Sequence, residues 1–160
     1  MNATATSSPD LQLVDGKSGD LDSVIEIMNS AFDERFGEAW TRSQCAGILP
    51  MPGVKLVVAR IDGRAAGFSL HRIISDEAEL LLLAVSPDLR RHGIGRMLLD
   101  DFLDNARSRG VARVHLEVRE GNPAVIMYRS AGFALAGRRR KYYRGRFGGE
   151  FDALTLGRDL

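Results

Sequence analysis

The sequence predicts an α/β fold of the mixed α+β type, in which helices flank a central mixed sheet. Three observations carry this prediction. First, residues 80–85 form an unbroken apolar run between turn signals, which is typical of a strand buried at the centre of a sheet. Second, residues 93–109 have apolar side chains at helical spacing, on a stripe formed by Ile94, Leu98, Phe102 and Ala106. Third, a further strand at 111–119 follows this helix, which predicts one parallel crossover near the middle of the sheet.

The other elements follow from periodicity and from turn residues. Asp62-Gly63 is a typical hairpin turn, and Asn122-Pro123 reads as an N-cap followed by proline at the first helical position. No repeat or linker interrupts the chain, so we expect residues 10–160 to form a single domain after a flexible tail at 1–9. The expected strands are 11–14, 54–61, 65–74, 77–85, 111–119, 133–143 and 151–156, and the expected helices are 20–32, 41–49, 93–109 and 123–132.

The composition excludes several classes of partner and site. The 22 basic and 21 acidic residues nearly cancel, so the whole chain has no field that would attract nucleic acid. The single cysteine, Cys45, excludes an internal disulfide and fits a reducing cytoplasm, and the three histidines show no metal-ligand spacing. No apolar run approaches the roughly 20 residues that span a bilayer. We therefore expect a cytoplasmic protein without a metal and without a membrane partner.

The segment 85–96 predicts a binding site for a phosphate group. A buried strand ends here, a turn follows, and Gly93 and Gly95 open a helix whose first N–H groups have no partner. These glycines have no side chain that would keep a phosphate from the N–H groups, and positive charge is added by Arg90, Arg91 and Arg96. Neither a dinucleotide fingerprint nor a P-loop fits, because position 98 is a leucine and Gly95 precedes Arg96-Met97. A basic turn in which the glycines serve only tight geometry is the alternative.

The strand at 111–119 alternates between an apolar and a polar face, and the polar face carries a candidate base. Glu117 lies on it together with Arg113, His115 and Arg119. A strand beside the central one is normally apolar on both faces, so this face needs a cleft, an exposed side or a covering of paired charges. Glu117 is therefore either a catalytic carboxylate or an ion-pair partner of Arg113 or Arg119, and His115 is a rival base.

The spacing Arg90-x-x-Gly93-x-Gly95 after a buried strand resembles the pyrophosphate motif of the GCN5-related N-acetyltransferases, the GNAT family. The resemblance extends over the fold and is strongest from Glu77 to Phe133. Within the family, several segments look like the ribosomal-protein-alanine N-acetyltransferase (RimI) type: Phe36–Thr41, Leu116–Arg119, Asn122, Tyr128, Gly132-Phe133 and Arg139–Tyr143.

This resemblance implies the acyl-CoA N-acyltransferase fold, with acetyl-CoA as co-substrate in a gap between the two middle strands. It also implies transfer of the acetyl group to the N-terminal α-amine of a protein partner, the N-terminal alanine of a ribosomal protein, with Glu117 as general base and Tyr128 as general acid. The implied acceptor groove carries four aromatic residues, Phe36, Trp40, Tyr142 and Tyr143. The implied coenzyme A contacts are Leu83, Ala84, Val85, Arg90, Arg91, His92, Gly93, Ile94, Gly95, Arg96 and Asn122.

An α-amine suits this pair of residues better than a lysine does. Near pH 7 roughly one α-amine in ten is neutral, but only a few lysines in ten thousand, because their pKa values are about 8 and about 10.4. A single carboxylate can therefore serve an N-terminus. Tyr128 has an alternative role as a core residue with its hydroxyl at the rim. The alternatives for the whole protein are a GNAT enzyme acting on lysine or a small amine, and a coenzyme A- or RNA-binding module without catalysis.

The spacing from Asn122 to Tyr128 departs from the family pattern. It is six positions, one fewer than is usual, and one residue of helix corresponds to about 100° of rotation. Tyr128 keeps its usual distance from Gly132-Phe133, so the change falls on Asn122. A plain N-cap is therefore the alternative to a coenzyme A contact at this residue.

Residues 138–146, with the sequence RRRKYYRGR, form the one dense positive patch. Basic and aromatic residues together can bind RNA by phosphate contact and stacking. They can also contact a peptide or protein, or they can simply block strand-on-strand association at a sheet edge. We favour the edge and peptide interpretations over RNA.

Overall fold

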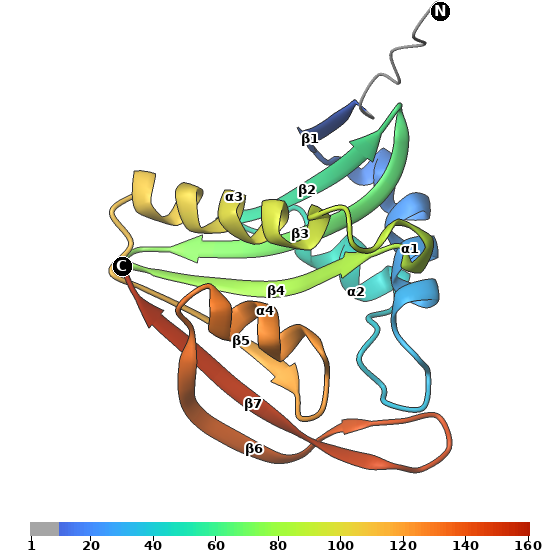
Figure 1. The fold of residues 1–160 in the computed structure, drawn as a ribbon, viewed down its shortest axis with the longest axis vertical. Helices are drawn as coiled ribbons and strands as arrows, with labels where there is room; N and C mark the ends of the chain where they lie inside the picture. The colour runs from blue at the N-terminus through green and yellow to red at the C-terminus, as the bar shows by residue number, and fades with distance from the viewer. Residues whose placement is uncertain (1–9) are drawn as a thin grey trace, which may run out of the picture.

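The computed structural model describes residues 10–160, so the tail expected at 1–9 lies outside the described residues. The chain forms one seven-stranded mixed sheet with helices on both faces (Figure 1). The strands are β1 (Leu11–Asp15), β2 (Val54–Ile61), β3 (Arg64–Ile74), β4 (Glu77–Val85), β5 (Arg113–Arg119), β6 (Ala134–Arg144) and β7 (Glu150–Asp159). Their order across the sheet is β1-β2-β3-β4-β5-β7-β6, which confirms the predicted fold class and places β4 at the centre.

The expected helices are also present. They are α1 (Leu21–Ala31), α2 (Arg42–Ile48), α3 (Ile94–Ser108) and α4 (Ala124–Ser130), with short 3-10 turns η1 (Ser18–Asp20) and η2 (Pro87–Leu89). α4 begins one residue later than expected: Pro123 occupies the cap position with helical dihedrals, and the Asn122 side chain accepts from the Ala124 amide. No helix within residues 10–160 is long and apolar enough to cross a membrane.

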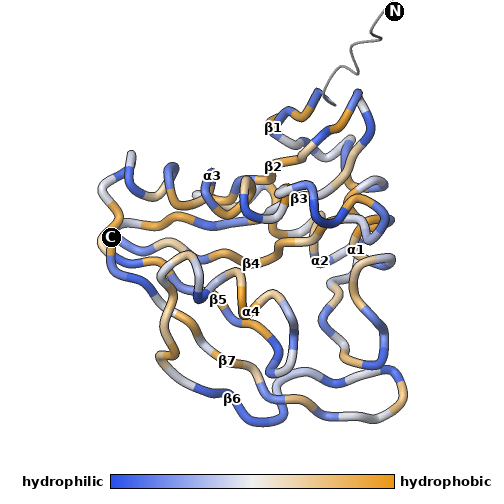
Figure 2. Tube along the Cα trace, in the orientation of Figure 1, coloured by the Kyte–Doolittle hydropathy of each residue, from blue (hydrophilic) through white to orange (hydrophobic). Residues whose placement is uncertain are grey.

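The helices pack on both faces of the sheet. α1 and α2 cover one face of β2–β4, where the core includes Val24, Met28, Val58 and Phe68. α3 crosses the opposite face, and α4 lies on that face against β5 (Figure 1). Figure 2 shows hydrophobic stretches along the central strands and a long hydrophilic stretch in β6.

The centre of the sheet is interrupted on one side of β4. The antiparallel ladder from β3 passes from the pair Leu70–Leu82 to the pair His71–Leu80, so Leu81 is an extra residue that bulges β4. The parallel ladder to β5 runs only from Glu77–Arg113 to Leu80–Leu116, so the two strands diverge beyond Leu80. The apolar run in β4 is therefore not fully covered on both faces as expected, because the residues after the bulge line a cleft.

Candidate active site

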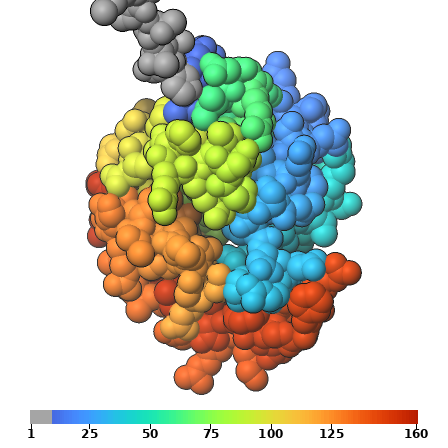
Figure 3. All heavy atoms as spheres, turned by 45° about the vertical axis from the view of Figure 1, so that its right-hand side comes forward, coloured from blue at the N-terminus to red at the C-terminus, as the bar shows by residue number. Residues whose placement is uncertain are grey.

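A cleft of about 810 Å³ opens where β4 and β5 diverge. Its walls come from the second half of β4, the end of β5, the turn before α3, the start of α4, the loop at 32–40 and two tyrosines of β6. Figure 3 shows the hollow on the surface where the turn before α3, the loop after α1 and the α4 region meet. The cleft therefore lies at the carboxyl ends of two parallel strands, where ligands of α/β sheets commonly bind.

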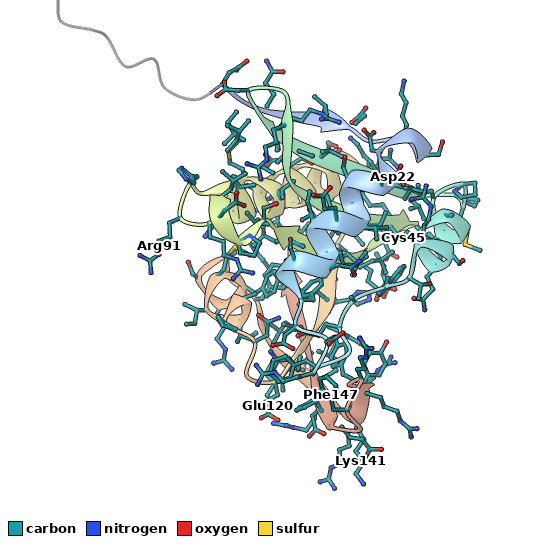
Figure 4. The ribbon with its side chains drawn as sticks, turned by 90° about the vertical axis from the view of Figure 1, so that its right-hand side faces the viewer. Asp22, Cys45, Arg91, Glu120, Lys141 and Phe147 are labelled. Atoms are coloured by element: carbon teal, nitrogen blue, oxygen red, sulfur yellow. The ribbon has the colours of Figure 1, made fainter. Side chains whose placement is uncertain are left out.

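One end of the cleft is built to accept an anion. None of the main-chain amides from residue 90 to residue 96 donates to a main-chain oxygen within residues 10–160. Gly93 makes this turn with a φ of +74°, in the left-handed region that favours glycine. Arg90 donates to the carbonyl of Ala31 at 3.3 Å, while Arg91 projects outward into solvent (Figure 4). Free amides at the start of a helix, with arginines beside them, fit a diphosphate group.

Two residues of this turn differ in detail from the sequence interpretation. His92 is exposed and is not among the residues that line the cleft. A Cβ on Gly95 would lie 3.3 Å from the Met127 sulfur, so this glycine allows close packing of α3 on α4 and not only the approach of a phosphate. The remaining turn residues predicted to bind coenzyme A, Arg90, Arg91, Gly93, Ile94, Gly95 and Arg96, all line the cleft.

The edge of β4 continues the anion site along the cleft. Leu83, Ala84 and Val85 line it, and beyond Leu80 no residue of β5 pairs with β4. The main-chain N–H and C=O groups on this side of the strand are thus free for an extended ligand, which could pair with them as an added strand.

Glu117 lines the cleft from β5, and its side chain is 15% exposed. Its ion-pair partner is Arg139 of β6, with 2.9 Å between Nε and Oε1. The alternative interpretation, in which Glu117 is an ion-pair partner of Arg113 or Arg119, names the wrong partners, because Arg113 pairs with Asp159 and Arg119 with Glu38. These two arginines have closer carboxylates on β7 and on the loop after α1, which only the tertiary fold brings near.

His115, the rival base, lies two residues before Glu117 on the same strand. Its Nε2 is 3.8 Å from Glu79 of β4, the residue opposite it in the parallel ladder. Glu79 lines the cleft but His115 does not. The geometry therefore favours Glu117 over His115 as the candidate general base, because only Glu117 lines the cleft in which a ligand would bind.

Tyr128 belongs both to the core and to the cleft wall. Only 6% of the residue is exposed, and its ring lies edge-on to Phe133 with 6.0 Å between centroids. Burial, and then the negative charge of Glu38, raise the pKa of its phenol well above the usual value. At neutral pH the phenol is therefore protonated and has a proton to donate.

The four aromatic residues predicted for the acceptor groove come together at the other end of the cleft. Phe36, Trp40, Tyr142 and Tyr143 all line it. The rings of Tyr142 and Tyr143 are edge-to-face at 4.9 Å, and Phe36 packs edge-on against Phe151 at 5.1 Å. Burial and the carboxylate of Glu117 raise the pKa of Tyr142, so its hydroxyl is also a donor at neutral pH. This end of the cleft is thus lined by aromatic rings and tyrosine hydroxyl donors. The opposite end, at the turn before α3, is lined by arginines.

Residues 21–133 match the acetyltransferase (GNAT) family. The chain belongs to the GNAT family.

Related proteins agree with this membership. The [ribosomal protein bS18]-alanine N-acetyltransferase of Salmonella typhimurium is 45% identical over 96 residues, which cover 59% of this chain and 64% of that protein, less than two thirds of its length. The N-alpha-acetyltransferase RimI of Mycobacterium tuberculosis is 42% identical over 116 residues, 69% of this chain and 70% of that protein. The crystal structure of the ribosomal-protein-S18-alanine N-acetyltransferase from Escherichia coli superimposes with a TM-score of 0.83 at 31% identity and covers 94% of each chain. The expected GNAT fold is confirmed.

Sequence reasoning missed one part of this GNAT cleft. Glu38 and Arg119 form a buried ion pair in its wall, and Asn122 donates to the same carboxylate. Glu38 is separated from Arg119 by 81 residues and from Asn122 by 84. The sequence signal available was a lone glutamate between Phe36 and Trp40, which no spacing rule connects to β5.

The basic patch at 138–146 is largely neutralised by acidic residues. Arg138 pairs with Glu120 and Asp152, Lys141 and Arg144 with Glu150, and Arg146 with Glu34. Arg139 is held by Glu117, and Arg140 forms no ion pair with any residue of 10–160. The patch therefore presents much less free positive charge than its sequence suggests, which weakens the RNA interpretation.

Proposed function

We propose that this GNAT protein transfers the acetyl group of acetyl-CoA to the N-terminal α-amine of a protein. One observation carries the proposal: a single cleft joins a turn of free amides to a wall that contains both Glu117 and Tyr128. The turn and the free edge of β4 fit the diphosphate and the extended arm of coenzyme A. This arrangement would bring the acyl end of the carrier toward the two titratable side chains.

Glu117 and Tyr128 have complementary roles in the proposed reaction. Acetyl-CoA, when bound, supplies an acyl thioester, which is open to attack by a neutral amine. Glu117 accepts the proton that the α-ammonium group loses, directly or through a water molecule. As the C–N bond forms and the C–S bond breaks, Tyr128 donates its phenolic proton to the sulfur. The nitrogen then loses its surplus proton to the Tyr128 phenolate, directly or through water, which leaves a neutral amide and restores the phenol. The raised pKa of Tyr128 means that the proton is present before the reaction, while it also makes the phenol a weaker acid toward the thiolate.

The acceptor class follows from proton chemistry and from the relatives. One partly buried carboxylate is enough for an α-amine, whose pKa is about 8, whereas a lysine with a pKa of about 10.4 presents far less neutral amine. Relatives at 42–45% identity are named as N-alpha-acetyltransferase or as alanine N-acetyltransferases of ribosomal protein bS18. We therefore propose the N-terminal alanine of a ribosomal protein as the acceptor, and the cytoplasm, where ribosomes work, as the place of reaction.

The test is incubation with acetyl-CoA and a panel of peptides, including alanine-first ribosomal N-termini, matched peptides with a blocked α-amine, and peptides with an internal lysine. Mass spectrometry should locate the acetyl group on free α-amines. Glu117→Gln and Tyr128→Phe should each lower turnover by about a hundredfold or more, because each removes a proton transfer. The dissociation constant of acetyl-CoA, measured by calorimetry, should stay the same in both variants.

Two controls accompany this test. Glu120→Gln makes the same chemical change on a carboxylate that pairs with Arg138 outside the cleft, and it should leave turnover unchanged. His115→Gln tests the rival base and should have a much smaller effect than Glu117→Gln. Near-normal turnover in both Glu117→Gln and Tyr128→Phe would refute the assigned roles, and acetylation confined to lysine would refute the acceptor class.

A further inference from the structure

A buried cluster of three side chains joins the acceptor end of the cleft to the start of α4. The Glu38 carboxylate accepts hydrogen bonds from Arg119 Nε and Asn122 Nδ2, each at 2.8 Å. The side chains of Glu38 and Arg119 are only 9% and 10% exposed, and all three residues line the cleft. Hydrogen bonds to a charged group are strong, and removing one partner leaves a buried charge without compensation. The proposed reaction uses none of these three groups.

Both ends of the Asn122 side chain are already engaged within the protein. Its Nδ2 donates to Glu38, and its Oδ1 accepts from the Ala124 amide at 2.9 Å, which caps the start of α4. These two bonds fix the orientation of the amide group toward Glu38 and α4, using one of its two N–H donors and one of its two acceptor positions. The shortened spacing between Asn122 and Tyr128 is consistent with a different use of this asparagine in this chain.

The loop that carries Glu38 is fixed at a second place, by the tip of the β6–β7 hairpin. A Cβ on Gly37 would lie 2.0 Å from a carbonyl oxygen of the hairpin, and one on Gly145 would lie 1.7 Å from a carbonyl oxygen of the loop. The Arg146 amide donates to the Glu34 carbonyl at 3.0 Å. The main chain of the loop therefore contacts the main chain of the hairpin tip directly, without side chains between them. Glu38 fixes the following part of the loop through its bonds to Arg119 and Asn122.

The cluster also contacts the aromatic residues of the acceptor end. The Arg119 guanidinium lies over the Phe36 ring, with 3.7 Å from Cζ to the ring centroid. The charge of Glu38 contributes, after burial, to the raised pKa of both Tyr128 and Tyr143. Moving Glu38 would therefore change the position of Phe36 and the electrostatic surroundings of both phenols.

We propose that Asn122, Glu38 and Arg119 are positioning residues that fix the loop at 33–41 for the acceptor, and that Asn122 acts through Glu38 and not on coenzyme A. The proposal rests on the proposed function, since the acceptor is the amine that Glu117 and Tyr128 serve. It assigns to Asn122 a role on the acceptor side, in place of the coenzyme A contact that the family resemblance implies.

Three measurements on Asn122→Ala and Glu38→Gln test the proposal. These are the dissociation constant of coenzyme A by calorimetry, KM and kcat for an alanine-first peptide, and hydrogen exchange of residues 33–41. Loss of one hydrogen bond to a charged group should raise the peptide KM about tenfold in Asn122→Ala, with the coenzyme A constant within about twofold of the wild-type value. Exchange of residues 33–41 should become faster in both variants.

A matched control is Asn105→Ala, which removes an asparagine whose amide bonds to Asp101 within α3, away from the cleft. This variant should change none of the three measurements. The double variant Asn122→Ala with Glu38→Gln should be no worse than the more damaging single variant, because both remove the same interaction. If thermal unfolding shows that Asn122→Ala does not fold, Asn122→Ser replaces it, since serine can still cap α4 but is too short to reach Glu38.

Two results would overturn the proposal. One is a coenzyme A constant weakened about tenfold in Asn122→Ala with an unchanged peptide KM, which would place Asn122 on the carrier. The other is unchanged exchange of residues 33–41 in both variants. Neither the calorimetry nor the exchange needs an acceptor, so both still report on the cluster if no peptide is acetylated, a result that would defeat the proposed function alone.

Discussion

At the scale of single residues, the anion site depends on a backbone conformation that few side chains adopt. Gly93 has a φ of +74°, and a Cβ placed there would meet no atom within 4 Å. A substitution would therefore strain the main chain without causing a clash. The cost of a side chain in the left-handed region is roughly 1–2 kcal/mol. Relief of this strain would change the dihedral angles of the turn and therefore the directions of its amides.

Gly93→Ala should lower the free energy of unfolding by about 1 kcal/mol and weaken coenzyme A binding about tenfold, whereas Gly93→Asn should do less harm because asparagine tolerates this region. Chemical denaturation and calorimetry measure the two effects. The matched control is Gly110→Ala at the far end of α3, where φ is +71° and space is also open. It should lose similar stability and keep its affinity, and an equal loss of affinity in both variants would contradict the prediction.

Residues with a local signature could be identified from the sequence, and residues defined by distant partners could not. Gly93, Glu117 and Tyr128 belong to short motifs that can be read directly from the sequence. All three residues line the cleft. Their roles in binding and catalysis stay predictions. Glu38 has meaning only when β5 and the loop after α1 are folded together. The Arg139–Glu117 pair likewise depends on how β6 crosses β7, which no spacing in the sequence encodes.

At the scale of elements, α2 is a short helix that begins with a reciprocal cap. Thr41 Oγ1 accepts from the Gln44 amide at 3.2 Å, and the Gln44 side chain accepts from the Thr41 amide at 2.8 Å. This capping box satisfies two N–H groups at the helix start. It also fixes the end of the loop that carries Trp40 into the cleft.

Thr41→Ala should therefore lower the free energy of unfolding by about 1 kcal/mol, the usual contribution of an N-cap side chain. Thr41→Ser keeps the hydroxyl and should retain most of that stability. Denaturant unfolding of the two variants beside the wild type measures the difference. Equal stability of the alanine and serine variants would show that the hydroxyl does not stabilise α2.

Most elements could be predicted because their periodicity and turn residues agree. The β4 bulge could not, since Leu81 stands within a uniform run of leucines that gives no sign of an extra residue. In the hairpin of β6 and β7, β6 has the expected length, but β7 runs to Asp159, three residues beyond the expected end, because its last residues pair with β5. The irregular register of the hairpin between Arg139 and Tyr143, where Lys141 has a φ of +53°, has no signal in the sequence either.

At the scale of the whole molecule, stability should depend on the protonation of a buried histidine. His71 of β3 is 1% exposed and packs against Phe102 of α3 with 5.2 Å between ring centroids. Burial, followed by the charges of Lys55 and Arg109, lowers its pKa from 6.5 to about 4. Its Nδ1 has no hydrogen-bond partner among the described residues, which suits a neutral ring.

The sign of the effect follows from linkage. Between pH 6.5 and pH 4 the unfolded chain binds a proton at His71 and the folded protein does not, so the free energy of unfolding falls as the pH is lowered through this window. The full contribution is present above pH 6.5. We expect the wild type to lose about 3 kcal/mol more than His71→Leu between pH 7 and pH 4. Denaturant titrations of both proteins at several pH values measure this difference, and parallel curves would exclude the histidine as its source.

The short ladder between β4 and β5 has a mechanical consequence. Four residue pairs between β4 and β5 join the two halves of the sheet at one end. Beyond Leu80 these two strands are not paired. An extended ligand that hydrogen-bonds along β4 and binds the turn before α3 would bridge this gap between the strands. A bound ligand of this kind would hold the two halves of the sheet together, so it should stabilise the whole domain and not only the residues that it contacts.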